Sequence, residues 1–228
     1  MNMDIVRRMA QVFLTLLIQS IILFVSAGTL SWNWAWIFIV IGIFILVINY
    51  TVLPREVIEE RGREKKNVKK WDKILMSINI VPILGIYVLS GLDYRFSWSP
   101  YLHYSIHILG IIAVFLGSML FTWSMVSNKF FSTMVRIQDE RGHSIAAEGP
   151  YRYVRHPGYV GYIVMAIATP LTLGSIYALL MSFLVMIIFI IRTILEDKTL
   201  LKELEGYKGY SKKVKYRLIP CIWLYGHI

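Results

Sequence analysis

Charged residues are scarce in this chain of 228 residues, and four long stretches contain none at all. Asp, Glu, Lys and Arg make up 17% of the sequence, whereas hydrophobic residues make up 57%. The uncharged stretches run from Met9 to Pro54, Ile74 to Leu92, Phe96 to Asn128 and His156 to Ile191. This composition excludes an ordinary soluble globular domain and indicates an integral membrane protein.

Several motifs of common enzyme classes are also missing. Cys221 is the only cysteine, so an internal disulfide is excluded. The sequence contains no Walker loop, HExxH pair, CxxC pair or Ser-His-Asp arrangement, which argues against nucleotide-driven transport and hydrolysis. His103 and His107 are four residues apart, but no acid or cysteine accompanies them. We therefore expect no metal site.

The lengths of the uncharged stretches predict an all-α fold with about six membrane helices, because a span needs about 20 apolar residues. The first stretch is long enough for two helices, and the two middle stretches for one each. The last stretch is short for two full spans, so we expect a tight helical hairpin that turns at Gly174 and Ser175. Within one structural domain, residues 1–127 would form four helices without a readable signature, and residues 128–228 would carry the polar motifs.

The net charge of +10 is distributed very unevenly along the chain. If six segments alternate across the membrane from a cytosolic amino terminus, every Lys and Arg except Arg95 falls on the cytosolic side. This asymmetry predicts that both termini are cytosolic. The basicity then reflects membrane orientation, and we expect membrane lipids and not nucleic acid as partners. The basic segment 55–70 is interpreted as a solvated helix extension near anionic headgroups.

The segment EGPYRYVRHPGYVGY, residues 148–162, introduces the hairpin. Pro157 fixes its own backbone angle and disfavours the helical conformation at His156, so we expect a helix to begin at Pro157. The free N–H groups of such a helix and its dipole favour an anion beside Arg155 and His156. A basic anchor at the membrane interface explains the same residues equally well.

A second polar cluster closes the last apolar stretch, in IIRTILEDKTLLKEL. Arg192 and Glu196 are four residues apart, hence on one helical face and able to pair, and Asp197 follows directly. Because the arms of a hairpin are antiparallel, we expect this cluster to meet His156 at the cytosolic membrane surface. A fork-shaped cation beside two carboxylates suits a zwitterionic or carboxylate ligand, although charges at helix ends also extend toward water without binding anything.

Two further features flank these clusters. Gly158 and Gly161 allow a neighbouring helix or a ligand to approach the first turns of the hairpin closely. The tail segment YKGYSKKVKYRLIP contributes Tyr207, Tyr210 and Arg217. These side chains would either fold over a ligand as a lid and contact the substrate, or dock on lipid headgroups.

Taken together, RGHSIAAEGPYRYVRHPGYVG and RTILEDKTLLKELEGYKGYSKKVKYRLIP resemble the isoprenylcysteine carboxyl methyltransferase family of integral membrane enzymes, in its bacterial or archaeal form. The resemblance extends over about residues 128–220. It implies a methyltransferase that uses S-adenosylmethionine, held on the cytosolic side by the loop and the hairpin, and a lipid-like or hydrophobic acceptor. Matched by position, Arg192 and Glu196 correspond to the catalytic Arg and Glu of the family.

The resemblance also implies a set of cofactor-binding residues in the loop, at the start of the hairpin and beside the catalytic pair. They are Ile145, Ala146, Ala147, Tyr151, Arg155, His156, Pro157, Tyr159, Gly161 and Asp197. Asp197 stands where many relatives have a longer glutamate. In this scheme Arg192 orients an acceptor carboxylate, and Glu196 fixes Arg192, binds the cofactor or serves as a base for an amine acceptor.

The acceptor stays open between a prenylcysteine-type carboxylate, another lipid carboxylate, a phospholipid amine and a small hydrophobic molecule. An NADPH-dependent membrane reductase of the sterol type is an alternative, since such proteins share an Arg-His-Pro-Asn-Tyr-x-Gly-Glu motif. This chain has Gly158 and Tyr162 in place of the Asn and the Glu. A non-enzymatic scaffold or anion-binding protein is a third possibility, although the apolar stretches contain no charge that marks a transport path.

Overall fold

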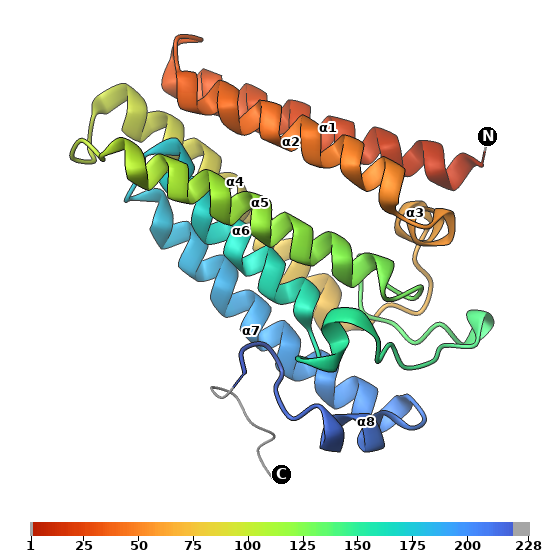
Figure 1. Ribbon diagram of the computed structural model, residues 1–228. Helices are drawn as coiled ribbons and strands as arrows, with labels where there is room; N and C mark the ends of the chain where they lie inside the picture. The colour runs from red at the N-terminus through yellow and green to blue at the C-terminus, as the bar shows by residue number, and fades with distance from the viewer. Residues whose placement is uncertain (1, 221–228) are drawn as a thin grey trace.

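A computed structural model describes residues 2–220 and is all-helical over that range (Figure 1). The long helices are α1 (Met3–Ala27), α2 (Asn33–Val52), α4 (Lys70–Phe96), α5 (Tyr104–Val126), α6 (Pro157–Leu173) and α7 (Ala178–Glu203). The connections contain the short helices α3 (Arg55–Gly62) and α8 (Tyr207–Lys213) and the 3-10 turns η1 (Asp139–Arg141) and η2 (Gly149–Arg152). The predicted all-α fold is confirmed, whereas Cys221 lies outside the described residues.

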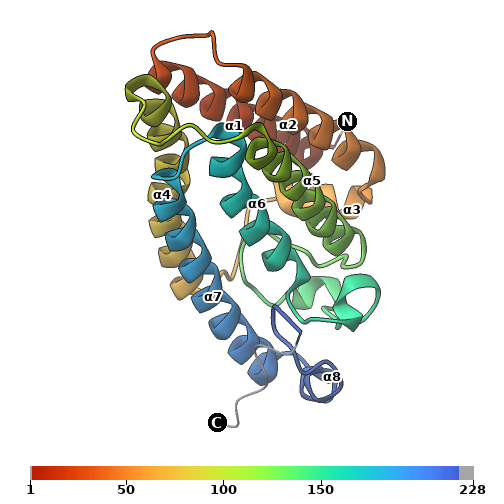
Figure 2. The ribbon, with the colours of Figure 1, turned by 60° about the vertical axis from the view of Figure 1, so that its left-hand side comes forward.

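Helix α6 occupies the centre of the bundle, between α5 and α7 (Figure 2). Helix α4 packs along α7, and α1 packs along α4 and α3. The long connections and the tail gather at one end of the bundle, and the short turns between helices gather at the other end (Figure 1). We refer to these as the long-loop end and the short-turn end. The polar motifs of the sequence therefore meet at the long-loop end.

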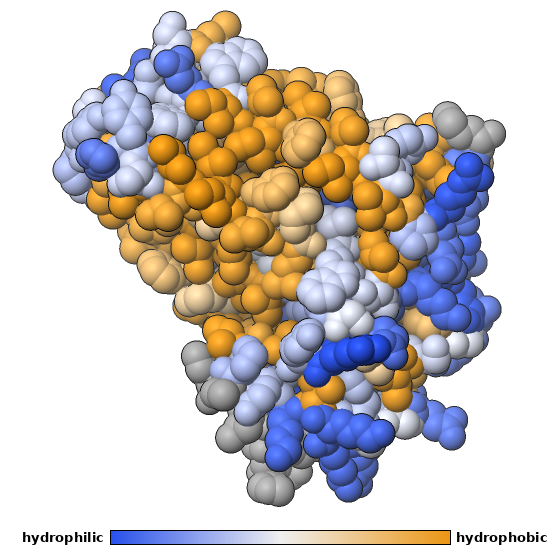
Figure 3. Space-filling view, in the orientation of Figure 1, coloured by the Kyte–Doolittle hydropathy of each residue, from blue (hydrophilic) through white to orange (hydrophobic). Residues whose placement is uncertain are grey.

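The surface and the helix lengths agree with a polytopic membrane protein. Helices α1, α2, α4, α5 and α7 are long and apolar enough to cross a membrane, and α6 is a shorter apolar helix of 17 residues. On the face seen in Figure 3, hydrophobic residues form a broad belt, and hydrophilic residues gather below it toward the long-loop end. The number of spans and the cytosolic orientation stay predictions.

The predicted hairpin of α6 and α7 is confirmed, including its turn. Gly174 ends α6 with a φ of +85°, a conformation that glycine adopts without strain. Ser175 follows and donates a hydrogen bond from Oγ to Oδ2 of Asp93 (2.5 Å), while the backbone N–H of Ser99 donates to Oδ1 of Asp93 (2.7 Å). One carboxylate of α4 thus holds two of the connections at the short-turn end.

The two histidines of α5 have packing roles. Nδ1 of His103 accepts a hydrogen bond from the backbone N–H of Ser105 (3.3 Å) and caps the start of α5. His107 is buried, with Nδ1 2.9 Å from the carbonyl oxygen of Thr172 and its ring stacked on Trp34 at 4.2 Å. His103 thus stabilises the start of α5, and His107 joins α5 to α2 and α6.

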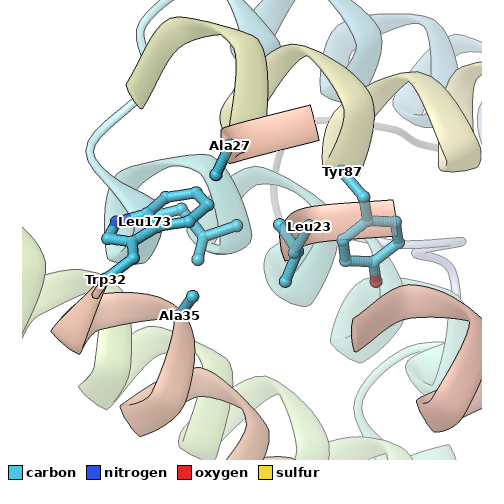
Figure 4. Packing of buried hydrophobic residues seen from close by; sticks show 6 residues of the cluster. All are labelled: Leu23, Ala27, Trp32, Ala35, Tyr87 and Leu173. Atoms are coloured by element: carbon cyan, nitrogen blue, oxygen red, sulfur yellow. The ribbon is translucent and has the colours of Figure 1, made fainter. Parts of the chain in front are cut away.

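A compact apolar cluster pins α1 and α2 to the rest of the bundle near the short-turn end. It joins α1, α2, α4 and α6 with the connection between α1 and α2 (Figure 4) through Leu23, Ala27, Trp32, Ala35, Tyr87 and Leu173. Burial of such apolar side chains stabilises the packing by about 25 cal/mol per Å². This cluster therefore fixes the α1–α2 pair to the bundle near the short-turn end.

The interpretation of segment 55–70 as a solvated extension is wrong for α3, which packs against α1 and whose Glu60 is 1% exposed, whereas Arg63, Glu64 and Lys66 after it are exposed. Glu60 accepts hydrogen bonds from Nη2 of Arg136 (3.1 Å) and lies 3.3 Å from Nζ of Lys65. Burial alone would raise the pKa of Glu60, but Lys65 and Arg136 outweigh it and lower that pKa. The segment is part of the folded structure at the long-loop end.

Candidate functional site

The two polar clusters that were expected to meet do so at the long-loop end. Helix α6 begins at Pro157, and His156 precedes it in a non-helical conformation, both as predicted. Nδ1 of His156 lies 4.0 Å from Oε2 of Glu196, and Nε2 lies 3.5 Å from Oδ1 of Asp197. Residues about 40 positions apart in sequence thus form one cluster because the hairpin folds back on itself.

A cavity of about 100 Å³ lies beside this cluster. We call it the donor cavity, after the methyl donor that the resemblance of the sequence implies. Its walls come from the loop 128–146, the start of α6, the end of α7, and α8. The predicted site residues that line it are Ile145, Ala146, Tyr151, Arg155, His156, Tyr159, Arg192, Glu196, Tyr207 and Tyr210. Residues that the sequence assigned to a cofactor, to catalysis and to a lid therefore lie around one space.

Five other predicted site residues do not line this cavity: Ala147, Pro157, Gly161, Asp197 and Arg217. Ala147 is exposed, and Pro157 is the buried first residue of α6. A Cβ atom on Gly161 would meet the carbonyl oxygen of Gly117 at 2.5 Å, so this glycine allows α5 and α6 to pack closely. The roles of these residues toward a cofactor stay predictions.

Asp197 is fully buried and joins four segments of the site. Its Oδ1 accepts from Nε of Arg155 (2.8 Å) and from the hydroxyl of Tyr207 (2.9 Å). Its Oδ2 accepts from Nη2 of Arg155 (2.9 Å) and from Nε of Arg217 (3.0 Å). The anion expected near the start of α6 is thus a carboxylate of the chain itself, and it connects α7 with the hairpin junction, α8 and the tail.

Arg192 pairs with Asp72 of α4 and not with Glu196, which corrects the pairing expected from the sequence. Nε and Nη2 of Arg192 donate to the two carboxylate oxygens of Asp72 at 2.8 and 3.1 Å. Nη2 also donates to the carbonyl oxygen of Thr133 (3.1 Å), and Asp72 accepts from the backbone N–H of Val135 (2.7 Å). Both partners are buried, so the guanidinium is held in one orientation.

Asp72 was missed because it lies between lysines, just ahead of an apolar stretch, where a solvated acid is expected. The periodicity of α4 contains a signal that would have found it. Asp72 is four residues before Met76 and shares its helical face with Asn79 and Ile83, which point into the bundle. An acid on the buried face of a membrane helix requires a cationic partner.

Aromatic rings form one wall of the donor cavity. The ring of Tyr159 stacks on His156 (5.6 Å between centroids) and lies under the guanidinium of Arg192 (5.1 Å). Its hydroxyl donates to Glu196. Such a wall suits a ligand with a cationic centre, because the faces of aromatic rings attract cations.

The predicted lid residues are fixed in place in this structure. Tyr207 and Tyr210 are buried, and the hydroxyl of Tyr210 donates to the carbonyl oxygen of Tyr151 (2.7 Å). Burial, and then the charge of Asp197, raise the pKa of Tyr207 well above its usual value, so this side chain remains a hydroxyl donor. The backbone N–H groups of residues 155 and 156 donate to carbonyl oxygens of the tail at 2.9 Å.

His143 lies in the loop that lines the donor cavity, and no role was predicted for it beyond its place in the motif. Its Nδ1 accepts a hydrogen bond from the backbone N–H of Gln138 (3.2 Å), and its ring packs on Phe130 (4.6 Å). Burial lowers the pKa of His143, which keeps the imidazole neutral and able to accept that bond. The loop conformation therefore depends on an uncharged histidine.

Comparison with known proteins identifies a family for part of the chain. Residues 108–202 match the model of the isoprenylcysteine carboxyl methyltransferase (ICMT) family. This segment contains α6, most of α7 and the loop over the donor cavity. The family resemblance predicted from the sequence is confirmed.

Curated relatives have a matching name. A protein-S-isoprenylcysteine O-methyltransferase of Schizosaccharomyces pombe is 34% identical over 102 residues, which is 43% of this chain and 43% of that protein. A probable protein-S-isoprenylcysteine O-methyltransferase of Oryza sativa subsp. indica is 28% identical over 109 residues, or 46% and 57% of the two chains. One of Saccharomyces cerevisiae is 31% identical over 110 residues, or 47% and 46%. The alignments thus span about half the length of these relatives.

Proposed function

We propose that this chain, in which residues 108–202 match the isoprenylcysteine carboxyl methyltransferase family, is a membrane methyltransferase that uses S-adenosylmethionine. The acceptor is a lipid-like carboxylate, with a prenylcysteine carboxylate as the first candidate because the relatives are named for it. One observation carries the proposal. Side chains from the loop, both hairpin helices and α8 line a single cavity within and beside the matched segment.

The residues around the donor cavity suit a sulfonium amino acid in their chemistry. Glu196 offers a carboxylate, Arg192 a cation, and Tyr151, Tyr159 and Tyr207 offer aromatic faces and hydroxyl groups. The volume of about 100 Å³ is smaller than the roughly 300 Å³ at which small-molecule sites begin. Binding S-adenosylmethionine therefore requires this cavity to widen.

The bound donor supplies a methyl group on a positively charged sulfur. Arg192 contributes a fixed positive charge at the wall, because Asp72 and Thr133 hold two of its nitrogens. Glu196, oriented by the hydroxyl of Tyr159, contributes a carboxylate that binds a cationic or hydroxyl group of the donor. Both residues act by positioning, which is the effect that brings two reactants into line.

A carboxylate acceptor needs no general base, because it carries no proton to remove before it attacks the methyl group. An amine acceptor would need one, and Glu196 would be the candidate. A carboxylate acceptor therefore suits this site, because the carboxylates of Glu196 and Asp197 are already held by hydrogen bonds from Tyr159 and Arg155. We therefore place O-methylation ahead of methylation of a phospholipid amine.

Calorimetric titration of the purified protein in detergent separates the proposed class from its rivals. S-adenosylmethionine and its demethylated product should bind, whereas NADPH should not. Saturable binding of NADPH alone would instead support the reductase. Failure of all three ligands to bind would support a non-enzymatic protein.

Transfer of a radiolabelled methyl group tests the acceptor. A farnesylated cysteine derivative with a free carboxylate should be labelled in a base-labile ester, and phosphatidylethanolamine should not. Glu196→Gln should reduce labelling at least about tenfold, since it removes one charge from the cavity wall. Glu203→Gln, on the same helix but paired with Lys69 at the surface, is the matched control and should leave labelling unchanged.

A further inference from the structure

A second cavity of about 340 Å³ lies among α1, α2, α4, α5 and α6, and we call it the membrane cavity. Side chains from helices on opposite sides of this space line it, such as Leu16, Phe38, Ile45, Ile86 and Val114. Most of its lining is aliphatic or aromatic. Its size falls within the range of about 300–1,000 Å³ that is typical of small-molecule sites. Apolar walls of this kind suit a single hydrocarbon chain.

The cavity begins beside the apolar cluster near the short-turn end. Tyr87 lines the cavity and also belongs to the cluster with Leu23, Trp32 and Leu173 (Figure 4). Lining residues such as Leu53 and Ile58 carry the cavity toward the long-loop end, where the donor cavity also lies. A ligand in this cavity would therefore have its apolar chain between the helices and its polar head near the long loops.

Two arginines line the membrane cavity at that end, Arg8 of α1 and Arg61 of α3. They are brought together by close packing of the two helices, since a Cβ atom on Gly62 would lie 1.9 Å from the carbonyl oxygen of Asp4 and 3.0 Å from Cβ of Arg8. The absence of a side chain at Gly62 is thus required for this arrangement.

Neither arginine has a carboxylate within ion-pair distance in the described part of the chain. The acids nearby have other partners, since Glu60 pairs with Arg136 and Lys65, and Asp4 lies 3.6 Å from Arg63. Burial, and then repulsion by Arg8 and Arg192, lower the pKa of Arg61 to about 9, so Arg61 still carries its charge at neutral pH. A partly buried cation of this kind is stabilised by an anionic ligand.

The charge on Arg61 lies one aromatic layer from the donor cavity. Its guanidinium carbon is 5.4 Å from the ring centroid of Phe131 and 5.6 Å from that of Phe121. Phe131 lines the donor cavity and packs on Gly158, where a Cβ atom would meet its ring at 2.8 Å. An anion bound at Arg61 is therefore adjacent to the wall behind which the donor would bind.

We infer that the membrane cavity is the acceptor site, in which Arg61 and Arg8 bind the carboxylate of a single-chain lipid whose apolar chain lies among α1, α2, α5 and α6. This inference rests on the proposed methyltransferase function for its catalytic meaning, but the binding it describes can be measured without turnover. It assigns a specificity role to α1 and α3, which lie outside the segment that matches the family.

The reaction itself removes the charge that these arginines bind. For transfer, the carboxylate must move from Arg61 past the ring of Phe131 into the donor cavity. There an oxygen of the carboxylate would form a bond to the methyl carbon, the bond between that carbon and sulfur would break, and its electron pair would stay on sulfur. No proton is released, and the product ester is neutral. The ester has lost its ionic contact with Arg61, so it leaves more readily than the acid. A phosphate head would keep a negative charge after one methylation, which is why we favour a carboxylate.

Binding of a fluorescent polyene fatty acid of 18 carbons tests this inference, with the full chain in discs of neutral lipid and empty discs as the reference. Stearate should displace the probe at least about tenfold more strongly than methyl stearate or octadecyl phosphate, because only the acid matches the site in charge and in geometry. Arg61→Gln should reduce the preference for acid over ester to less than about threefold. Arg7→Gln, next to Arg8 but with a side chain 47% exposed and near Asp4, should preserve it.

Equal displacement by acid and ester, or an unchanged preference in Arg61→Gln, would overturn the inference. Stronger displacement by the alkyl phosphate would also overturn it, because the head would then be a phosphate. Calorimetric binding of the demethylated donor to each variant keeps the two proposals apart. If the donor does not bind the wild-type protein while the acid preference holds, the methyltransferase proposal fails and the lipid-acid site stands.

Discussion

The two cavities of this protein treat their arginines in opposite ways. Around the donor cavity, Arg155 and Arg192 each have a buried carboxylate partner within 3 Å, Asp197 and Asp72. In the membrane cavity, Arg8 and Arg61 line an apolar space without such a partner in the described residues. A cation paired by the protein is part of a preformed wall, whereas a cation without an acid is available to a ligand.

This difference predicts that paired and unpaired arginines contribute differently to the stability of the fold. Removal of one partner from a buried ion pair destabilises a protein, because the other charge is left in an apolar environment. Removal of an uncompensated cation eliminates a cost of the same kind and need not destabilise the fold. Substitutions in the ion pairs and substitutions of the uncompensated arginines should therefore change the free energy of unfolding by different amounts and in opposite directions.

The largest effect is expected at Asp197, a fully buried carboxylate that accepts hydrogen bonds from Arg155, Arg217 and Tyr207. Asp197→Asn leaves Arg155 without its buried anion and weakens the contacts of Tyr207 and Arg217. We expect destabilisation by about 3–5 kcal/mol, measured as a lower midpoint of thermal unfolding in detergent. Glu203→Gln removes a pair at the surface and should cost less than about 1 kcal/mol. Similar midpoints for the two variants would contradict the role given to Asp197.

Asp72→Asn should give the next largest effect, and it should appear in donor binding as well as in stability. Arg192 would keep its hydrogen bond to Thr133 but lose its buried anion and one of its two contacts with residue 72, so its orientation at the cavity wall would be less firmly fixed. We expect the affinity for the demethylated donor to fall at least about tenfold, or about 1.4 kcal/mol, in calorimetric titration. A purely structural role would lower the unfolding midpoint but leave the affinity of the folded fraction unchanged.

Two arginines, one in α3 and one paired with an acid of α3, test whether the two kinds of substitution change stability in opposite directions. Arg136→Gln removes a cation that is paired with buried Glu60 and should lower the unfolding midpoint. Arg61→Gln removes a cation without such a partner and should leave the midpoint unchanged or raise stability by up to about 1 kcal/mol. If both variants are destabilised alike, Arg61 is not an uncompensated charge.

The smallest effect concerns pH and the loop over the donor cavity. Since burial lowers the pKa of His143 below its usual 6.5, the unfolded loop takes up a proton before the folded loop does. The ordered loop is therefore fully stabilised above about pH 6.5 and loses stability as the pH falls below that value. Hydrogen exchange of residues 129–147, corrected for intrinsic rates, should be faster at pH 5.5 than at 7.5 by less than about tenfold. In His143→Gln this added pH dependence should be absent.

The elements that could be predicted from sequence are those with local causes. Pro157 begins α6 because proline fits the first helical position, and Gly174 ends it because glycine accepts the left-handed conformation. The meeting of His156 with Glu196 then followed from the antiparallel hairpin. Each of these conclusions needed only neighbouring residues and one fold-back of the chain.

The features that were missed depend on contacts between distant segments. Arg192 pairs with a residue 120 positions away, and nothing near Asp72 in sequence distinguishes it from a solvated acid. Glu60 is buried because Arg136 reaches it from the loop before α6. The membrane cavity is likewise lined by helices that are far apart in sequence, from α1 to α6, and no local pattern indicates it.

The division into a donor site and an acceptor site is tested most directly by one set of calorimetric titrations with the demethylated donor, on the wild type, Glu196→Gln and Arg61→Gln. The account predicts a single site in the wild-type protein, an affinity at least about tenfold weaker in Glu196→Gln, and an unchanged affinity in Arg61→Gln. No binding to the wild type, or a loss in Arg61→Gln as large as that in Glu196→Gln, would contradict it.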